Sequence, residues 1–412
     1  MRYAGIPGLY VNAIIEISIL LFFIGSVHLS FLKRKTLKLP AIEPFLIFSL
    51  VLFLSIEYNE SDIFHSFLMY RHFVWPYLFF VAIYNLNIST VSLKKINKFI
   101  IFFILLQIPA AVYKYLMYGM REGTIIGTFA NDSGSMSTIF PLFIIGYLIS
   151  LYLVYKRNPI YLLLIIGFMF FAWGGGKRAF FLVLPGLLLA ALFMYNIAYI
   201  RSLNLAKLTS MILLVFILLI SIIYTGGRML PTLNPENKVG GRFDLAYMTN
   251  YVVQYESRTR SDTHETRGRI STTKNIFNHF IKVDLNRKIL GDGPDRLYTL
   301  EASGDARHSY GFGYGMTGVI FSIISVGLFG TLSLFYLYVS VGMKSIRLYK
   351  AIPDPFYKAI AFGTILATLI YCFDFLMYSR AFMFMFMPSV LFFYIVAMLI
   401  KIHTNNESYQ EV

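Results

Sequence analysis

Residues 137–155 read STIFPLFIIGYLISLYLVY, a run without one charged side chain that ends directly before Lys156 and Arg157. A helix of this length covers the hydrocarbon core of a bilayer, about 30 Å, and satisfies its backbone polar groups internally. Lysine and arginine gather in the cytoplasmic loops of membrane proteins. The stretch therefore predicts a transmembrane helix that ends on the cytoplasmic side.

Similar apolar runs recur along the chain. Of the 412 residues, 57% are hydrophobic and 14% charged, with a mean hydropathy of +0.66, too apolar for a domain surrounded by water. The sequence predicts an all-α polytopic membrane protein with about eleven transmembrane helices. We place them near 11–32, 41–57, 73–88, 97–118, 137–155, 159–173, 178–200, 206–224, 314–343, 357–377 and 380–401.

The basic residues of the short loops predict the orientation. Basic loops alternate along the chain with the other connections, so they all fall on one side, which is the cytoplasm. Their basic residues are Lys33, Arg34, Lys35, Lys38, Lys94, Lys95, Lys98, Lys156, Arg157, Arg201, Lys207, Lys344, Arg347 and Lys350. The N-terminus is then outside, and the C-terminus inside. The connections 57–72, 119–135, 174–177 and 225–312 face outward, and the first apolar run is a retained span.

The chain divides into a membrane bundle and one long insertion. Residues 1–224 contain the first eight spans, 225–312 form a large outer-side (periplasmic) loop, 313–402 contain three more spans, and 403–412 form a cytoplasmic tail. Long loops in compact proteins are usually functional or disordered. Apolar residues at helical spacing predict two helices in this one, through Leu245–Tyr255 and Ile270–Ile281, so we expect it to be partly folded and to cap the outer face.

Composition excludes several classes of function. The single cysteine, Cys372, excludes an internal disulfide framework and a cysteine-based zinc site, and no cluster of carboxylates suggests a metal. The net charge of +15 resides largely in the cytoplasmic loops, as the topology requires, so no nucleic-acid partner is expected.

Basic residues on the predicted outer side are not explained by topology. They would suit a bound anion such as a lipid-linked diphosphate, because the guanidinium fork matches phosphate oxygens. The alternative is that they are solvated loop charges paired with nearby carboxylates. These residues are Arg71, His72, Arg121, Lys177, Arg178, Arg267, Arg269, Arg307, His308 and Arg380.

Two of these basic residues are the strongest candidates. Arg178 follows three glycines and begins an apolar helix, where the backbone can approach a ligand closely and the helix dipole favours an anion. His308 precedes a glycine-rich turn and can act as a general base near neutral pH, although a lone histidine is more often structural. Within the spans, Asp374 and Glu16 mark either a transport path or pairing between helices.

Three stretches resemble a known family. GTFANDSGSMSTIFPLFII (127–145), GGGKRAFF (174–181), and the set TRGRISTTKNIFNHF (266–280), GDGPDRL (291–297) and RHSYGFGYGMTGVIFSIISVGLFG (307–330) are similar in order and topology to motifs of the O-antigen polymerase (Wzy) and O-antigen ligase (WaaL) superfamily of bacterial membrane glycosyltransferases. This sequence departs from the family pattern at Ser309, Lys177 and Phe277, where asparagine, serine and tryptophan are usual.

The resemblance implies a metal-independent, cofactor-free glycosyltransferase of the bacterial cytoplasmic membrane. It would use an undecaprenyl-diphosphate-linked glycan on the outer face, with His308 as catalytic base and Arg178 and Arg269 holding the diphosphate. Further substrate-binding candidates are Lys177, Arg267, Arg307, Arg71, Arg380 and Arg121. We favour a polymerase of lipid-linked repeat units, with a possible chain-length regulator as partner. The alternatives are a ligase that transfers finished glycan to lipid A core or protein, and a lipid-linked oligosaccharide flippase.

Overall fold

The computed structural model describes residues 8–34, 36–86, 88–119, 127, 135–199, 205–257, 259–260, 265–266, 268–296, 316–384 and 386–407. Helices form almost all of this part of the chain. The helices of the bundle are α1 (Gly8–Leu32), α2 (Ile42–Tyr58), α3 (Ile63–Asn85), α4 (Thr90–Leu105), α5 (Gln107–Tyr118), α6 (Met136–Ser150) with the π-helical η2 (Leu151–Tyr155), α7 (Pro159–Gly174), α8 (Arg178–Tyr199), α9 (Leu205–Met229), α15 (Gly318–Ala351), α16 (Pro355–Phe373) with the π-helical η4 (Asp374–Tyr378), α17 (Ala381–Phe384) and α18 (Phe386–Glu407).

The length and composition of these helices define an all-α polytopic membrane protein. Within the described residues, eight helical stretches are long and apolar enough to cross a membrane. They are Ala13–Leu32, Ile63–Asn85, Thr90–Tyr118, Met136–Tyr155, Arg178–Asn196, Gly318–Ala351, Pro355–Tyr378 and Met387–Asn405. The helix α7 is apolar but shorter. The predicted total of eleven spans therefore stays a prediction.

The helix α6 forms the centre of the bundle. Each of its residues is buried, which in a helix without polar faces requires protein on all sides. A cluster of stacked aromatic rings beside it joins α15, α16 and α18, with Tyr338 and Tyr371 4.5 Å apart between ring centroids. In contrast, α1 exposes apolar side chains along most of its length, as expected for a helix that faces lipid.

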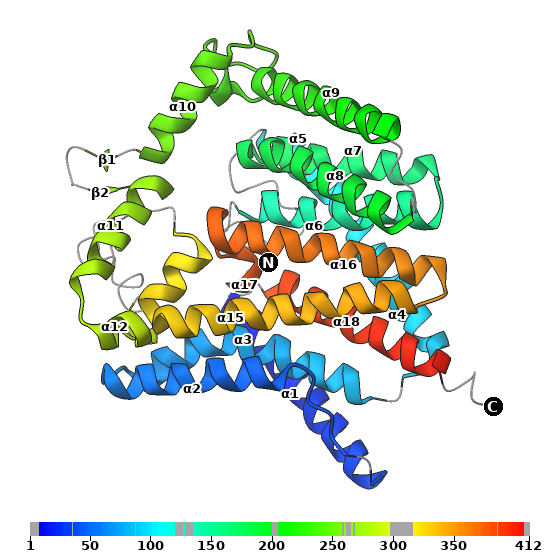
Figure 1. Ribbon diagram of the computed structural model, residues 1–412, viewed down its shortest axis with the longest axis vertical. Helices are drawn as coiled ribbons and strands as arrows, with labels where there is room; N and C mark the ends of the chain where they lie inside the picture. Colours follow the sequence, from blue (N-terminus) through cyan, green and yellow to red (C-terminus); the bar gives the residue numbers. More distant parts are fainter. Residues whose placement is uncertain are drawn as a thin grey trace.

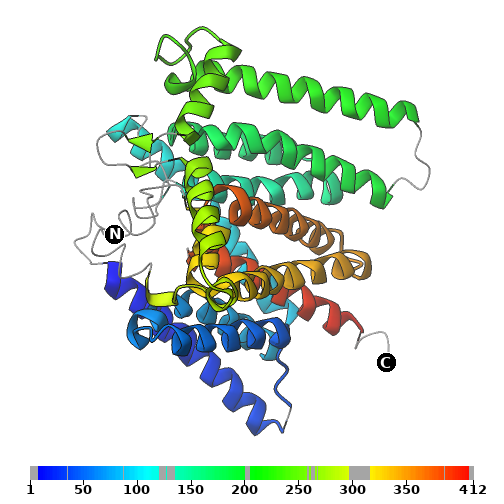
Figure 2. The same ribbon diagram turned by 60° about the vertical axis from the view of Figure 1, so that its left-hand side comes forward.

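The long connection between α9 and α15 folds into a loop cap. It contains η3 (Pro231–Leu233), α10 (Leu245–Ser257), a short hairpin of β1 (Thr259–Arg260) and β2 (Glu265–Thr266), α11 (Arg269–Lys282) and α12 (Leu285–Leu290). Both views show α10, α11 and α12 lying across one end of the bundle (Figures 1 and 2). The two helices predicted in this loop are confirmed as α10 and α11.

The opposite end of the bundle carries the basic connections. The end of α8, the start of α9, the link between α15 and α16 and the end of α18 lie there (Figure 1). We call this the basic end and the other the cap end. The short basic connections therefore gather at one end of the bundle, and the loop cap at the other end carries both basic and acidic residues. The orientation in the membrane stays a prediction.

The loop cap is anchored where α15 is broken. Val326 and Gly327 have non-helical backbone angles, and Gly327 has a φ of +64°, a conformation that only glycine adopts without strain. A Cβ atom at Gly327 would lie 2.2 Å from the carbonyl oxygen of Ile289 in α12. The amide of Asp292, just after α12, donates to the carbonyl of Ile324 at 2.6 Å. Backbone therefore packs directly against backbone at this break.

A second anchor joins the loop cap to the turn between α2 and α3. The Asp284 carboxylate caps α12 at the amide of Arg287 and accepts a hydrogen bond of 2.9 Å from the hydroxyl of Tyr58. These two donors lower the pKa of Asp284. Asp295 accepts from the amide of Asp62 at 3.0 Å. The segment that follows α12 thus attaches the loop cap to the bundle.

Candidate anion-binding site

The turn between α7 and α8 positions Arg178. The amide of Lys177 donates to the carbonyl of Ala172, and that of Gly176 to the carbonyl of Trp173, a pattern that ends a helix with a left-handed glycine, here Gly176 with a φ of +65°. A Cβ atom at Gly175 would lie 2.8 Å from Ser137 in α6. The glycines therefore end α7 and allow it to pack on α6. Arg178 follows as the first residue of α8.

Arg178 is held by tyrosines of the loop cap. Its guanidinium carbon lies 4.2 Å from the ring centroid of Tyr255 and 5.0 Å from that of Tyr251, both in α10. Tyr247 extends this row, with successive centroids 6.2 Å apart. A cation over an aromatic face is attracted by the ring quadrupole. Arg178 therefore connects α8 to the loop cap and keeps a half-buried positive charge at the cap end.

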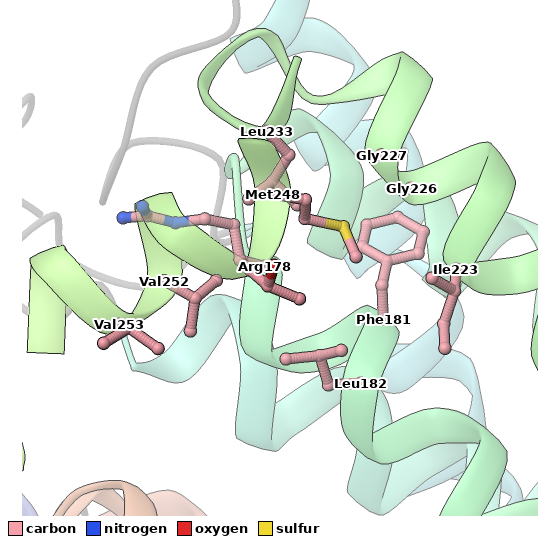
Figure 3. Close-up of a pocket in the computed structure, with 11 residues that line it drawn as sticks. Arg178, Phe181, Leu182, Ile223, Gly226, Gly227, Leu233, Met248, Val252 and Val253 are labelled. Carbon is pink, nitrogen blue, oxygen red and sulfur yellow. The ribbon is translucent and has the colours of Figure 1, made fainter. Parts of the chain in front are cut away.

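A pocket of about 200 Å³ lies beside Arg178, between α8, α9, η3 and α10. Figure 3 shows Arg178 at one edge, its guanidinium directed away from the apolar side chains of Phe181, Ile223 and Met248. Two glycines bring α9 close: a Cβ atom at Gly226 would lie 3.0 Å from Phe181. The pocket is therefore apolar inside, with a cation at its edge.

Arg269, the first residue of α11, connects the loop cap to the end of η4. Its Nε donates to the carbonyl of Tyr378 at 2.7 Å, and its guanidinium lies 4.7 Å from the ring of the same tyrosine. Its charge also acts on the buried carboxylate of Asp374. Arg269 is thus positioned by a second tyrosine, far from Tyr255 in sequence.

The first turn of α6 links these two arginines. Thr138 forms a hydrogen bond of 2.8 Å with the hydroxyl of Tyr378, the partner of Arg269. Its neighbour Ser137 contacts Gly175 in the turn that leads to Arg178. The structure therefore arranges both predicted diphosphate-binding residues around one buried helix end. Lys177, a second-tier candidate, is buried in the same turn.

Arg71 and Arg380 form a further basic group. Arg380 follows Tyr378 and lies 4.6 Å over the ring of Phe321, while Arg71 pairs with Glu16 at 3.5 Å. The charges of both arginines act on His72. The sequence placed Arg71 in an outer loop, which is wrong: α3 begins at Ile63, so Arg71 and His72 lie inside the helix. The hydroxyl-rich and charged start of α3 resembled a loop because it is less apolar than the rest of the span.

Two donors next to this group are buried and lack acceptors. Arg71 Nε and Trp75 Nε1, one turn apart on α3, have no hydrogen-bond partner among the described residues. A buried N–H without a partner costs free energy, so such groups usually face a water or a ligand. Both atoms would suit an anion or a sugar hydroxyl.

Four predicted site residues lie outside the described residues: the catalytic candidate His308, and Arg121, Arg267 and Arg307. The described part of the loop cap contains another histidine that sequence reasoning missed. His279 Nε2 lies 3.0 Å from the Asp292 carboxylate, whose side chain is 10% exposed. A carboxylate fixes the orientation of an imidazole in this way. The spacing of the two residues gives no sign of the pair, since it forms only when the turn folds back.

The intramembrane acid Asp374 is engaged by the backbone. Its carboxylate accepts a hydrogen bond from the hydroxyl of Ser379 and another, at 2.7 Å, from the amide of Phe382. Of the two explanations left open for Asp374, pairing within the bundle fits these contacts. Among the described residues, no group of three or more His, Cys, Asp or Glu side chains could hold a metal ion.

No family model matches this sequence, and no curated protein matches it. The chain is a multi-pass α-helical membrane protein with a folded loop cap, and Arg178 and Arg269 connect this loop cap to the bundle. Its function is therefore inferred from the site alone.

Proposed function

We propose that the protein is a membrane glycosyltransferase that polymerises lipid-linked polysaccharide repeat units from an undecaprenyl-diphosphate-linked donor. The observation that carries the proposal is the arrangement of Arg178 and Arg269. They come from two separate parts of the chain, and each is held by a tyrosine of another element. Each is also connected to the first turn of α6, Arg269 through Tyr378 and Arg178 through the turn at Gly175. Positioned arginines of this kind suit a diphosphate.

The proposed reaction needs a base and a stabilised leaving group. The hydroxyl oxygen of the acceptor sugar attacks the anomeric carbon of the donor, and its proton passes to His308. The bond between that carbon and the diphosphate oxygen breaks, and the electron pair leaves with the diphosphate. The leaving group gains negative charge in the transition state, so preplaced guanidinium groups lower the barrier. The anomeric configuration inverts, and no metal is required.

The second basic group extends the same site. Arg71 and Arg380, with the unpaired Arg71 Nε and Trp75 Nε1, offer donors where α3 meets the turn after η4. These groups would bind sugar hydroxyls or the second phosphate. Arg71 and Trp75 lie inside the span Ile63–Asn85, which fits a donor whose lipid remains in the bilayer.

Two observations weigh against a flippase. Asp374 is bonded to Ser379 and to the amide of Phe382, and Glu16 pairs with Arg71. A carboxylate that carries a proton or substrate through a membrane must change partners. These two acids instead stabilise local structure, which leaves the arginines as the functional charges.

The size of the glycan on the lipid carrier tests the proposal. In a host that lacks this gene, we expect single repeat units to accumulate on the carrier, and the wild-type gene to restore long chains. Long glycan stranded on the carrier would instead mean a ligase. Donor trapped on the cytoplasmic side would mean a flippase and would overturn the catalytic assignment.

Replacement of His308 by alanine is the second arm of this test. The variant should insert and fold normally but fail to restore polymer. The variant His279→Ala is the matched control, because it removes a second histidine of the loop. If only His279→Ala abolishes the product, the base is His279 and the role assigned to His308 is wrong.

A further inference from the structure

A polar pocket lies at the basic end, far along the bundle from the loop cap. Its volume is about 450 Å³, and it is formed by the ends of α1, α3 and α18 with the connection after α1. Three cations line it: Arg34, Lys38 and Lys401. The other lining residues are Ser30, Thr36, Tyr84, Asn85, Ile400 and Thr404, so none of the described lining residues is acidic.

The divergence of α1 from α3 opens this pocket. Ser26 of α1 donates to the carbonyl of Ala82 in α3 at 3.1 Å, and one turn later Ser30 already lines the pocket. Beyond this point α1 runs away from the bundle in both views (Figures 1 and 2). The pocket therefore continues into the lipid-facing surface of α1, where Leu29 and Phe31 are exposed.

Hydrogen bonds and a cation–π contact hold the walls of the pocket in place. Asn85 accepts from the amide of Lys38 at 2.9 Å and donates to its carbonyl at 2.7 Å, which holds this connection on the end of α3. Lys401 lies 5.8 Å from the ring of Tyr84. Arg34 has a φ of +48°, a conformation that is strained for a residue with a side chain. Arg34 adopts this conformation just after α1 and lines the pocket.

The three cations bring positive charge together in one pocket. The predicted topology explains why these cations lie at the cytoplasmic end. It does not explain why they converge in one pocket. Neither Arg34 nor Lys38 forms an ion pair with a described carboxylate. Basic pockets between transmembrane helices at this level bind the headgroups of anionic lipids.

We infer that this pocket binds the phosphate headgroup of an anionic phospholipid. The phosphate lies among Arg34, Lys38 and Lys401, and the hydroxyl groups of Thr36 and Thr404 form hydrogen bonds with the remaining headgroup atoms. The acyl chains lie along the exposed apolar face of α1. Because α1 packs mainly on α3, this lipid completes the contact between α1 and α18. The site is independent of the proposed catalytic function.

Lipid-dependent thermal stability tests this inference. The full chain in a non-ionic detergent is titrated with phosphatidylglycerol or with phosphatidylcholine of the same acyl chains, and the midpoint of unfolding is measured. The wild type should be stabilised by phosphatidylglycerol alone. In the variant Arg34→Gln/Lys38→Gln/Lys401→Gln, the concentration needed for half of this shift should rise at least about tenfold, since charge-assisted hydrogen bonds to phosphate are lost.

The control variant Lys94→Gln/Lys95→Gln/Arg157→Gln removes the same charge from exposed positions at the same end. It should keep the wild-type response. An equal loss in both variants would mean unspecific attraction to an anionic surface and would overturn the site. If the triple pocket variant does not fold, the single variant Lys401→Gln provides the same comparison against Lys95→Gln.

A final arm separates a lipid from a soluble anion. Inorganic phosphate and glycerol 3-phosphate are added without lipid, at constant ionic strength. Neither should shift the midpoint of the wild type, because the acyl chains supply part of the binding free energy. If either one reproduces the effect of phosphatidylglycerol, the pocket binds a soluble phosphate and the assignment to a lipid is wrong.

Discussion

Arg178 and Arg269 owe their positions to tyrosines that are distant in the sequence. Both arginines were predicted as site residues, because basic charge on the outer side has no topological reason. Their ring partners Tyr255 and Tyr378 were not predicted, although Tyr247, Tyr251 and Tyr255 recur every four residues and so share one helix face. A sequence shows which side chains share a face, but contacts between elements depend on how those elements pack.

Arg178 offers the first prediction at this scale. The variant Arg178→Gln should lower the rate of polymer synthesis about 10²- to 10³-fold, because the leaving diphosphate loses a preplaced charge. The apparent midpoint of thermal unfolding should change little. The exposed Arg287 of α12 is a matched control, and Arg287→Gln should keep near-normal activity. Synthesis at the wild-type rate by Arg178→Gln would contradict the proposed site.

The carboxylate of Asp374 should contribute to the stability of the fold rather than to turnover. The variant Asp374→Asn replaces a carboxylate that accepts from Ser379 and Phe382 and that faces the charge of Arg269, so it should cost about 1–3 kcal/mol of folding free energy. Turnover per folded molecule should stay close to normal. Thermal unfolding and product assays on the purified chain measure the two quantities. The exposed carboxylate in Glu57→Gln is the control, and lost turnover at unchanged stability would support transport instead.

At the scale of elements, the sequence predicted most helices but not their irregularities. The predicted span 178–200 corresponds to α8, and 41–57 to α2, because long apolar runs are unambiguous. Within 97–118 the helix breaks at Leu106, and 314–343 continues to Ala351 through a kink. Such breaks arise from neighbours, here α12 against α15, and the short α12 and the β1–β2 hairpin have no periodic signal of their own.

The kink in α15 provides the prediction at this scale. The variant Gly327→Ala would place a Cβ atom 2.2 Å from the Ile289 carbonyl and require a left-handed alanine. Strain of this kind costs about 1–3 kcal/mol, and overpacking adds a similar amount. The unfolding midpoint should fall clearly. Gly186 of α8 has nothing within 4 Å of its Cβ position, so Gly186→Ala should be neutral or stabilising.

Proteolysis distinguishes local from global damage in this variant. We expect Gly327→Ala to expose the loop cap to limited proteolysis while the bundle stays intact, since the break is an anchor of α12. Equal resistance of Gly327→Ala and Gly186→Ala would show that the loop cap does not depend on this contact.

At the scale of the whole molecule, the orientation is the main prediction. A chain with Cys372→Ser and one new cysteine should react with a membrane-impermeant maleimide in intact cells at Glu236→Cys in the loop cap, but not at Arg157→Cys at the basic end. Lysis should make the second position reactive. The reverse labelling pattern would mean that the bundle has the opposite orientation in the membrane, with the arginines on the cytoplasmic side. The helical bundle and two helices of the loop cap were thus predictable, whereas the packing of the loop cap on the bundle was not.

The break in α15 also indicates how deep the nearby residues lie in the bilayer. From Gly327 to Ala351 the helix rises about 37 Å, enough to cross the hydrocarbon without the preceding segment. Residues 318–326, and Arg380 above Phe321, then lie near the level of the lipid phosphates. A diphosphate attached to a membrane lipid stays at that level, so it would reach the arginines by sideways diffusion. Bilayer thickness, rather than solvent access, would then control how well the donor meets the site.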